Sequence, residues 1–241
     1  MVDEEKQVIL FIAEGPSDEA ALGTIMAECF SNDRVRFHVV HGDITTRDYV
    51  DIGGIVSKIK EQIDIVELRY HYRDEDFISI IHLVDTDGVF VPNDKVVPLS
   101  RVPDEEAASV LYFTDRMEAR NVQAIRARNN RKAKILYKLR KTGQIKHIPY
   151  RVYFNSCNLE HVLYGELREF SDDEKEEMAD SFAEKFENRA EDFVDFISGK
   201  EIAVVGTYQK TWDFIEKDLN SLNRHSNMNQ IFTHNTTSCK S

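Results

Sequence analysis

The stretch FISIIHLVDTDG (residues 77–88) is a nearly continuous apolar run that ends in two acids and a glycine. A short apolar run of this length is typical of a strand buried on both faces, as in a parallel sheet with helices on each side. Asp85, Thr86, Asp87 and Gly88 then lie at the carboxyl end of that strand. The pattern predicts an α/β fold with a site where this strand ends.

Two further strands and two helices are predicted before this run. The strands are residues 8–13 (VILFIA) and 35–40, and the helices, with apolar residues at helical spacing, are 18–30 and 51–70. The order strand, helix, strand, helix, strand predicts a parallel sheet with right-handed crossovers. Ligands of such sheets bind outside the carboxyl ends of the strands. Glu14, which follows the first strand, is therefore expected at the same edge as Asp85 and Asp87.

The rest of the chain is predicted to complete this sheet and to add helices. The predicted elements are an irregular excursion or hairpin at 89–113, a basic helix at 118–141, a fourth strand at 150–154, and helices at 159–164, 171–197 and 208–222. Ser171 to Glu174 forms a capping-box pattern. We therefore expect a central, mostly parallel sheet of four or more strands flanked by helices. The expected division is a catalytic domain at 1–165 with an insertion at about 89–148, a helical C-terminal extension at 166–223 packed on it, and a flexible tail at 224–241.

The charge of the chain is strongly segregated. Its formal net charge of -12 argues against general nucleic-acid affinity, yet residues 116–146 carry eleven Lys and Arg side chains against the single acid Glu118. Such a run is either a solvated helix face, packed in part against the acidic residues 166–195, or a local phosphate-binding surface. The side chains expected to contact nucleic acid are Arg126, Arg128, Arg131, Lys132 and Lys134.

Composition also indicates the cellular compartment of the protein. No run of 18 apolar residues is present, so we expect no membrane partner. The acidic start of the chain lacks the basic and apolar segments of a signal peptide. Cys29, Cys157 and Cys239 lie far apart, which argues for reduced thiols and against a disulfide framework or zinc site. These features favour a cytoplasmic protein.

The Asp-x-Asp pair suits a divalent metal ion. Asp85 and Asp87 place two carboxylates a few ångströms apart, and like charges at that distance favour a cation between them. Mg²⁺ (or Mn²⁺) takes oxygen ligands and keeps several waters, so two or three carboxylates suffice. The alternative is that Asp85 caps a turn and that Asp87 and Gly88 only form one.

Glu14-Gly15 combined with the later Asp-x-Asp resembles the Toprim domain of topoisomerases, bacterial primases and nucleases of the OLD group. The stretch EGPSDEAAL (residues 14–22) is most similar to the OLD type. The resemblance implies that Glu14, Asp85 and Asp87 are catalytic and hold metal, and that Asp18, with Glu19 as a further candidate, contributes to a second metal site. Asn158-Leu159-Glu160 resembles a downstream acidic motif of small defence-associated Toprim proteins, which adds Glu160 to the metal set.

The function implied by this resemblance is Mg²⁺-dependent cleavage of DNA or RNA by a standalone Toprim domain, in a setting such as phage defence. Because no Walker A pattern is present, an ATPase partner would be a separate protein. Two alternatives stay open. A haloacid-dehalogenase-like phosphatase would use Asp85 as nucleophile and Asp87 as acid and base. A non-catalytic Toprim-like scaffold would bind partners through the acidic helix at 171–197 and the tail.

Overall fold

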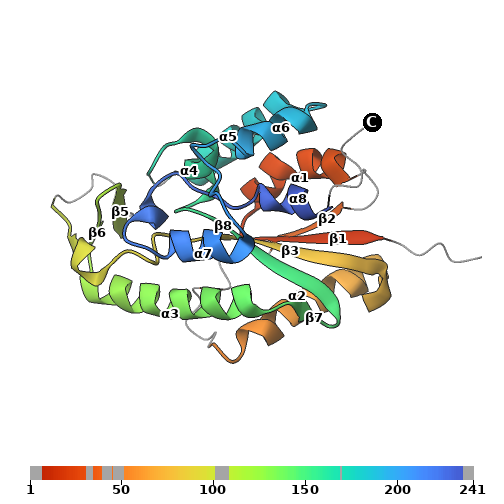
Figure 1. The fold of residues 1–241 in the computed structure, drawn as a ribbon, viewed down its shortest axis with the longest axis horizontal. Helices are drawn as coiled ribbons and strands as arrows, with labels where there is room; N and C mark the ends of the chain where they lie inside the picture. The colour runs from red at the N-terminus through yellow and green to blue at the C-terminus, as the bar shows by residue number, and fades with distance from the viewer. Residues whose placement is uncertain are drawn as a thin grey trace, which may run out of the picture.

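The computed structural model describes residues 7–30, 35–39, 45, 52–100, 109–168 and 170–235. Parts of four predictions lie outside these ranges: the strand end at Val40, the helix start at Asp51, residues 101–108 of the excursion, and the tail from residue 236. Within the described residues the chain forms an α/β fold, with a central sheet between two layers of helices (Figure 1).

The central sheet has five strands in the order β2-β1-β3-β8-β7. They are β1 (Val8–Ala13), β2 (Val35–Val39), β3 (Phe77–Asp85), β7 (Gln144–Ile145) and β8 (Ile148–Asn155). β1 pairs in parallel with β2 and β3, and β3 pairs in parallel with β8, whereas β7 joins β8 as an antiparallel hairpin. The predicted parallel arrangement is thus confirmed for four strands, and the stretch that predicted the fold forms the middle strand.

Helices cover both faces of the sheet (Figure 1). One apolar layer includes α1 (Pro16–Phe30), α4 (Leu159–Tyr164), α5 (Asp172–Phe186), α6 (Ala190–Ile197) and α8 (Gln230–Asn235). The other includes α2 (Ile55–Tyr70), α3 (Val122–Lys141) and α7 (Tyr208–Ile215). Ile9 and Phe11 of β1 pack in the first layer, and Leu10 and Ile12 pack in the second. Because both faces of β1 are covered, its sequence is apolar throughout instead of alternating.

The excursion after β3 forms a small second sheet in the order β4-β6-β5. Its strands are β4 (Val96–Pro98), β5 (Val110–Phe113) and β6 (Arg116–Ala119). The prediction of helix from residue 118 is therefore wrong for the first residues, since Glu118 and Ala119 pair with β5 in an antiparallel ladder. Helix α3 begins only at Val122, where the Asn121 side chain accepts a hydrogen bond from the backbone N–H of Ala124. Asn is a favoured residue at such a cap.

Two of the predicted C-terminal helices are interrupted. The predicted helix at 171–197 starts with the expected capping box but ends at Phe186, and α6 begins at Ala190. Asn188 between them has φ 55°, a left-handed conformation that a right-handed helix does not contain. The predicted helix at 208–222 ends at Ile215. Asp218 has φ 51°, and a short 3₁₀ turn follows at Asn220–Leu222.

The prediction of a flexible tail from residue 224 is wrong for the part that the structure describes. Ser226 forms β-bridges to Asn155 and Ala203, and the Asn227 side chain accepts a hydrogen bond from the backbone N–H of Phe154. Ile231 and Phe232 of α8 are buried against α1 and α6. The polar composition of this segment hid the few apolar residues that anchor it. No helix among the described residues is long and apolar enough to cross a membrane.

Ile231→Val tests the packing of this segment. Removing one methylene from a fully buried side chain is expected to lower the free energy of unfolding by about 0.5–1.5 kcal/mol. Val205→Ala, at a residue that is 89% exposed, is the control and is expected to change stability by less than about 0.5 kcal/mol. Urea denaturation of both variants gives the comparison. Equal stability of Ile231→Val and wild type would mean that α8 does not pack in solution.

Candidate functional site

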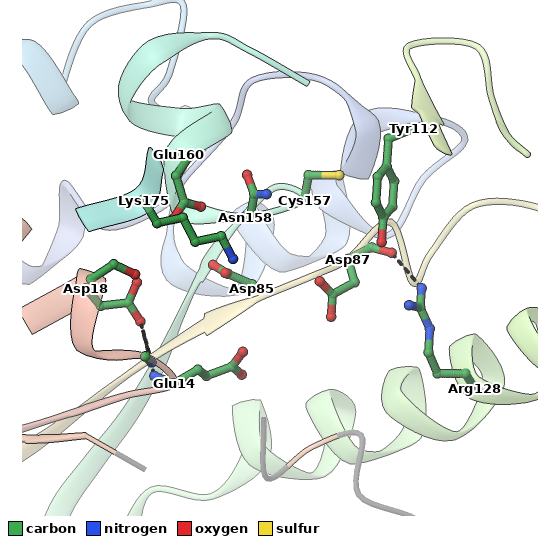
Figure 2. A pocket seen from close by; sticks show the side chains of 12 residues that line it. Glu14, Asp18, Asp85, Asp87, Tyr112, Arg128, Cys157, Asn158, Glu160 and Lys175 are labelled. Atoms are coloured by element: carbon green, nitrogen blue, oxygen red, sulfur yellow. Dashed lines mark hydrogen bonds between the residues drawn. The ribbon is translucent and has the colours of Figure 1, made fainter. Parts of the chain in front are cut away.

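A pocket of about 350 Å³ opens at the carboxyl ends of β1, β3 and β8 (Figure 2). The five acids predicted as metal ligands all line it. Its lining residues are Glu14, Gly15, Ser17, Asp18, Asp85, Asp87, Tyr112, Arg128, Cys157, Asn158, Glu160 and Lys175. Residues that are more than 140 positions apart in the sequence are therefore brought together by the parallel arrangement of the strands.

The turn between β1 and α1 positions Glu14 and Asp18. Asp18 Oδ2 accepts hydrogen bonds from the backbone N–H groups of Glu14 and Gly15, both at 3.1 Å. The carboxylate of Asp18 therefore closes this turn from the first turn of α1, where a negative charge is also favoured by the helix dipole. Asp18 also lines the pocket. Glu19, the further candidate, is exposed and does not line the pocket.

The turns after β3 and β8 are bonded to each other and fix the Asp-x-Asp pair. The backbone N–H of Asp87 donates to the Cys157 carbonyl at 2.9 Å, and the N–H of Cys157 donates to Thr86 Oγ1 at 3.0 Å. Asp85 Oδ1 accepts a hydrogen bond from Asn155 Nδ2 at 3.3 Å. The pair is thus anchored through the neighbouring strand as well as through its own.

Gly88 is required at the end of this turn. Its φ is 63°, and a Cβ at this position would lie 2.9 Å from both the Met117 sulfur and Leu222 Cδ2. Asp87 just before it also has a positive φ, of 48°. Asp is among the residues that tolerate this conformation, and Gly adopts it without a steric cost. The chain thereby turns sharply and leaves the Asp87 side chain at the pocket.

Glu160 comes from the first turn of α4, immediately after β8. The Asn158 side chain caps this helix by accepting a hydrogen bond from the backbone N–H of His161 at 2.8 Å. Glu160 is buried, and its charge acts on Asp85 of β3 and on Asp18 of α1. The Asn-Leu-Glu motif singled out in the sequence therefore reaches the same pocket as Glu14.

Burial and neighbouring charges shift the ionisation of two acids of the pocket, Asp85 and Asp18. Burial, and then the negative charges of Asp18, Glu160 and Asp87, raise the pKa of Asp85 well above its usual value. Burial likewise raises the pKa of Asp18 to about 6, with a further contribution from Glu160, against the lowering effect of its backbone hydrogen bonds. Perturbed carboxyl groups that share a pocket are typical of functional sites.

Three cationic side chains border these acids. Lys132 of α3 is completely buried, and its Nζ lies 2.6 Å from Asp87 Oδ2. Arg128, one turn earlier, donates to the Asp87 carbonyl oxygen at 3.0 Å. Lys175 reaches the pocket from α5 (Figure 2), and its charge lowers the pKa of Asp18. Lys175 could not be predicted from the sequence, because it lies within an acidic helix far from every motif, and no pattern pointed to Tyr112 of β5.

The residues predicted to contact nucleic acid lie in different surroundings. Lys132 is buried at Asp87 and Arg128 lines the pocket, as described above. Arg126 donates to the Val96 carbonyl oxygen at 2.9 Å. Arg131 is half-buried, and Lys134 is exposed. Of this set, Lys134 has the location that a surface phosphate contact requires.

Much of the remaining basic segment is neutralised within the molecule. Arg140 pairs with Glu216 at 3.0 Å. Lys146 pairs with three carboxylates of α2 and the turn after it, Asp64, Glu67 and Asp74, at 2.6–2.8 Å. The acids that pair with Arg140 and Lys146 therefore come from α2, from the turn after it and from the end of α7, and not from the acidic helix α5 as the sequence had suggested. Lys134, Lys138 and Lys141 form the exposed basic face of α3.

The pocket is lined by carboxylate oxygens, which are the type of ligand that a hard divalent cation prefers. Within the described ranges, no three His, Cys, Asp or Glu side chains are placed so that they already hold an ion. The carboxylates nevertheless gather in a partly buried pocket, where burial and the charges of neighbouring acids raise the pKa of Asp85 and of Asp18, and a bound cation relieves this electrostatic condition. Glu14, Asp85, Asp18 and Glu160 are the side chains that would hold it.

The raised pKa of Asp18 predicts a pH-dependent stability. The pKa of Asp18 is about 6 in the folded state and 3.8 as its ordinary value. Asp18 therefore contributes fully to the free energy of unfolding below pH 3.8, and this contribution is lost as the pH rises to about 6. In EDTA, Asp18→Asn is therefore expected to gain stability relative to wild type as the pH rises through this window. Melting temperatures measured at intervals of pH test this, with the exposed neighbour Glu19→Gln as control. Parallel curves for wild type and Asp18→Asn would contradict the assignment.

Comparisons with protein-family models, with curated proteins and with solved structures find no match for this chain. The site therefore stands on the geometry and charge of its own residues.

Proposed function

We propose that the protein is a Mg²⁺- or Mn²⁺-dependent enzyme that cleaves phosphodiester bonds of DNA or RNA, with a Toprim-like arrangement of its acids. The observation that carries this proposal is the convergence of Glu14, Asp85 and Glu160, from the ends of three parallel strands, on one pocket. Phosphoryl transfer needs a cation to neutralise the phosphate, and this cluster of acids is suited to bind one. In the proposed site the ion would supply Lewis-acid stabilisation of the phosphate oxygens.

The residues of the chain have separate tasks in this proposal. Asp85, held by Asn155 and repelled by its neighbours, gains most from a bound cation and is the principal ligand. Glu14 lies across the pocket from Asp85 (Figure 2) and moves the proton of the attacking water. Arg128 and Lys175 border the acids and attract the anionic substrate. The exposed face formed by Lys134, Lys138 and Lys141 contacts the nucleic-acid backbone without reading sequence.

Glu14 and Glu160 also weigh against the phosphatase alternative. That alternative uses Asp85 and Asp87 and gives no task to the acids that follow β1 and β8, although these acids face the same pocket. The scaffold alternative likewise leaves unexplained why charges that repel one another are kept together in a partly buried pocket. A separate ATPase remains part of the proposal as a partner.

Cleavage of supercoiled DNA and of RNA in Mg²⁺ and Mn²⁺ tests the proposal. We expect wild type and the exposed control Glu19→Gln to cleave, and Glu14→Gln to lose cleavage. Activity that survives Glu14→Gln but not Asp85→Asn would favour the phosphatase, as would turnover of p-nitrophenyl phosphate alone. Absence of cleavage together with absence of metal binding in calorimetry would favour the scaffold.

A further inference from the structure

The net charge of the described side chains around the pocket can be balanced by one divalent ion. Five carboxylates line it, from Glu14, Asp18, Asp85, Asp87 and Glu160. Among the described residues, the cationic groups beside them are Arg128 and Lys175 in the lining and Lys132 behind Asp87. Counted over these described side chains alone, with every acid ionised, the excess is two negative charges, which is the charge of a single Mg²⁺ or Mn²⁺.

The position of Lys132 decides where that ion binds. Its side chain is 0% exposed, so its ammonium group is stable only beside an anion, and Asp87 Oδ2 at 2.6 Å is such a partner. Arg128 adds a second cation at the carbonyl oxygen of the same residue. Asp87 is therefore already paired with Lys132 and Arg128. Asp85, in contrast, accepts a hydrogen bond from the neutral amide of Asn155.

A second ion beside Asp87 would lie close to the Lys132 ammonium group. Metal–oxygen distances of about 2.1 Å, combined with the 2.6 Å ion pair, place the two charges within roughly 5 Å when they share an oxygen. Like charges at this distance in a buried setting repel strongly. The two-ion arrangement, in which paired cations clamp both reacting oxygens, is therefore disfavoured at this position.

We infer that the site binds one divalent ion, on the side of Glu14 and Asp85, and that the fixed Lys132–Asp87 ion pair takes the place of a second. Lys132 is then a positioning residue, because it is buried and acts through Asp87. This inference rests on the proposed function, since it assigns the ion count of the same site.

Titration with Mn²⁺ alone, followed by electron paramagnetic resonance of the free ion and by calorimetry, measures that count without any activity assay. Wild type is expected to bind one ion. Lys132→Met removes the positive charge that neutralises Asp87, so a second ion is expected to bind at least about tenfold more tightly than any second ion in wild type. Lys132→Arg keeps the charge and is expected to bind one. Lys134→Met, which removes the same charge from the exposed face of the same helix, is the matched control and is also expected to bind one.

The outcomes separate this inference from the proposed function. Two ions of similar affinity in wild type, or an unchanged count in folded Lys132→Met, would overturn the one-ion site and leave the metal-dependent function standing. Absence of Mn²⁺ binding by folded wild type would overturn the proposed function itself. If Lys132→Met does not fold, Asp87→Asn/Lys132→Met removes both charges of the pair. It is expected to bind one ion with near wild-type affinity, and loss of that ion would show that Asp87 is a principal ligand.

Discussion

Asp85→Asn is expected to abolish cleavage while making the protein more stable. Loss of the principal carboxylate removes charge stabilisation that is worth about 10²- to 10³-fold in rate for a single preorganised group. In the absence of metal, the same change removes a charge that is disfavoured by burial and repelled by Asp18, Glu160 and Asp87. A folded-state pKa above the usual value means that stability is lost as the pH rises, so the gain from the substitution is largest at alkaline pH.

Cleavage rates and melting temperatures of wild type and Asp85→Asn at pH 8, with EDTA and with Mg²⁺, measure both effects. We expect Mg²⁺ to raise the melting temperature of wild type and to have little effect on the variant, because ligand binding stabilises only the form that binds. Asn155→Ala, which removes the neighbour that donates to Asp85, provides a comparison in which the carboxylate remains. A variant that is both inactive and less stable would indicate that Asp85 is a structural residue.

Asp87→Asn is expected to have the opposite effect on stability. The substitution leaves the ammonium group of Lys132 buried beside a neutral amide, and breaking a buried ion pair in this way costs about 3–5 kcal/mol. In a chain of this size the melting temperature is then expected to fall by roughly 6–20 °C. Two neighbouring carboxylates, separated by one residue, would therefore respond to the same chemical change with opposite signs.

The double variant Asp87→Asn/Lys132→Met supplies the control. Removing the buried charge together with its partner is expected to restore most of the lost stability, since apolar replacements of buried ion pairs are often neutral or stabilising. Denaturant unfolding of the two single variants and the double variant gives the coupling energy. Additive effects would mean that the pair contributes little and that Lys132 is stabilised by other contacts.

The sequence predicted the sheet and its acidic edge because both depend on local patterns. Continuous apolar runs such as residues 77–84 identify strands that are covered on both faces, and the order of elements brings Glu14 and Asp85 to one edge. Helix α4 at residues 159–164 follows from the same kind of local signal. These features are determined within short segments, or by a topological rule that has few exceptions.

What the sequence did not predict depends on contacts between distant segments. The pairing of Lys132 with Asp87 requires knowing which side of α3 faces the sheet, and the spacing of basic residues along this helix does not show it. Lys175 reaches the pocket only because α5 packs on α1. The break near Asn188 and the anchoring of Ile231 likewise result from tertiary packing, which overrides local propensity.

His225 and Ser226 cross the end of β8, so the hydrogen bonds that complete the pocket form only after these residues have been synthesised. The Ser226 hydroxyl donates to the Phe154 carbonyl and lies 3.2 Å from Asn155 Oδ1, and Asn155 in turn donates to Asp85. The backbone N–H of Ser156 donates to the His225 carbonyl at 2.8 Å. Because a ribosome makes residues 225 and 226 after every residue that lines the pocket, a nascent chain that stops short of them contains all the acids but lacks these bonds. The amide that orients Asp85 acquires its support only after all the acids of the pocket have been synthesised.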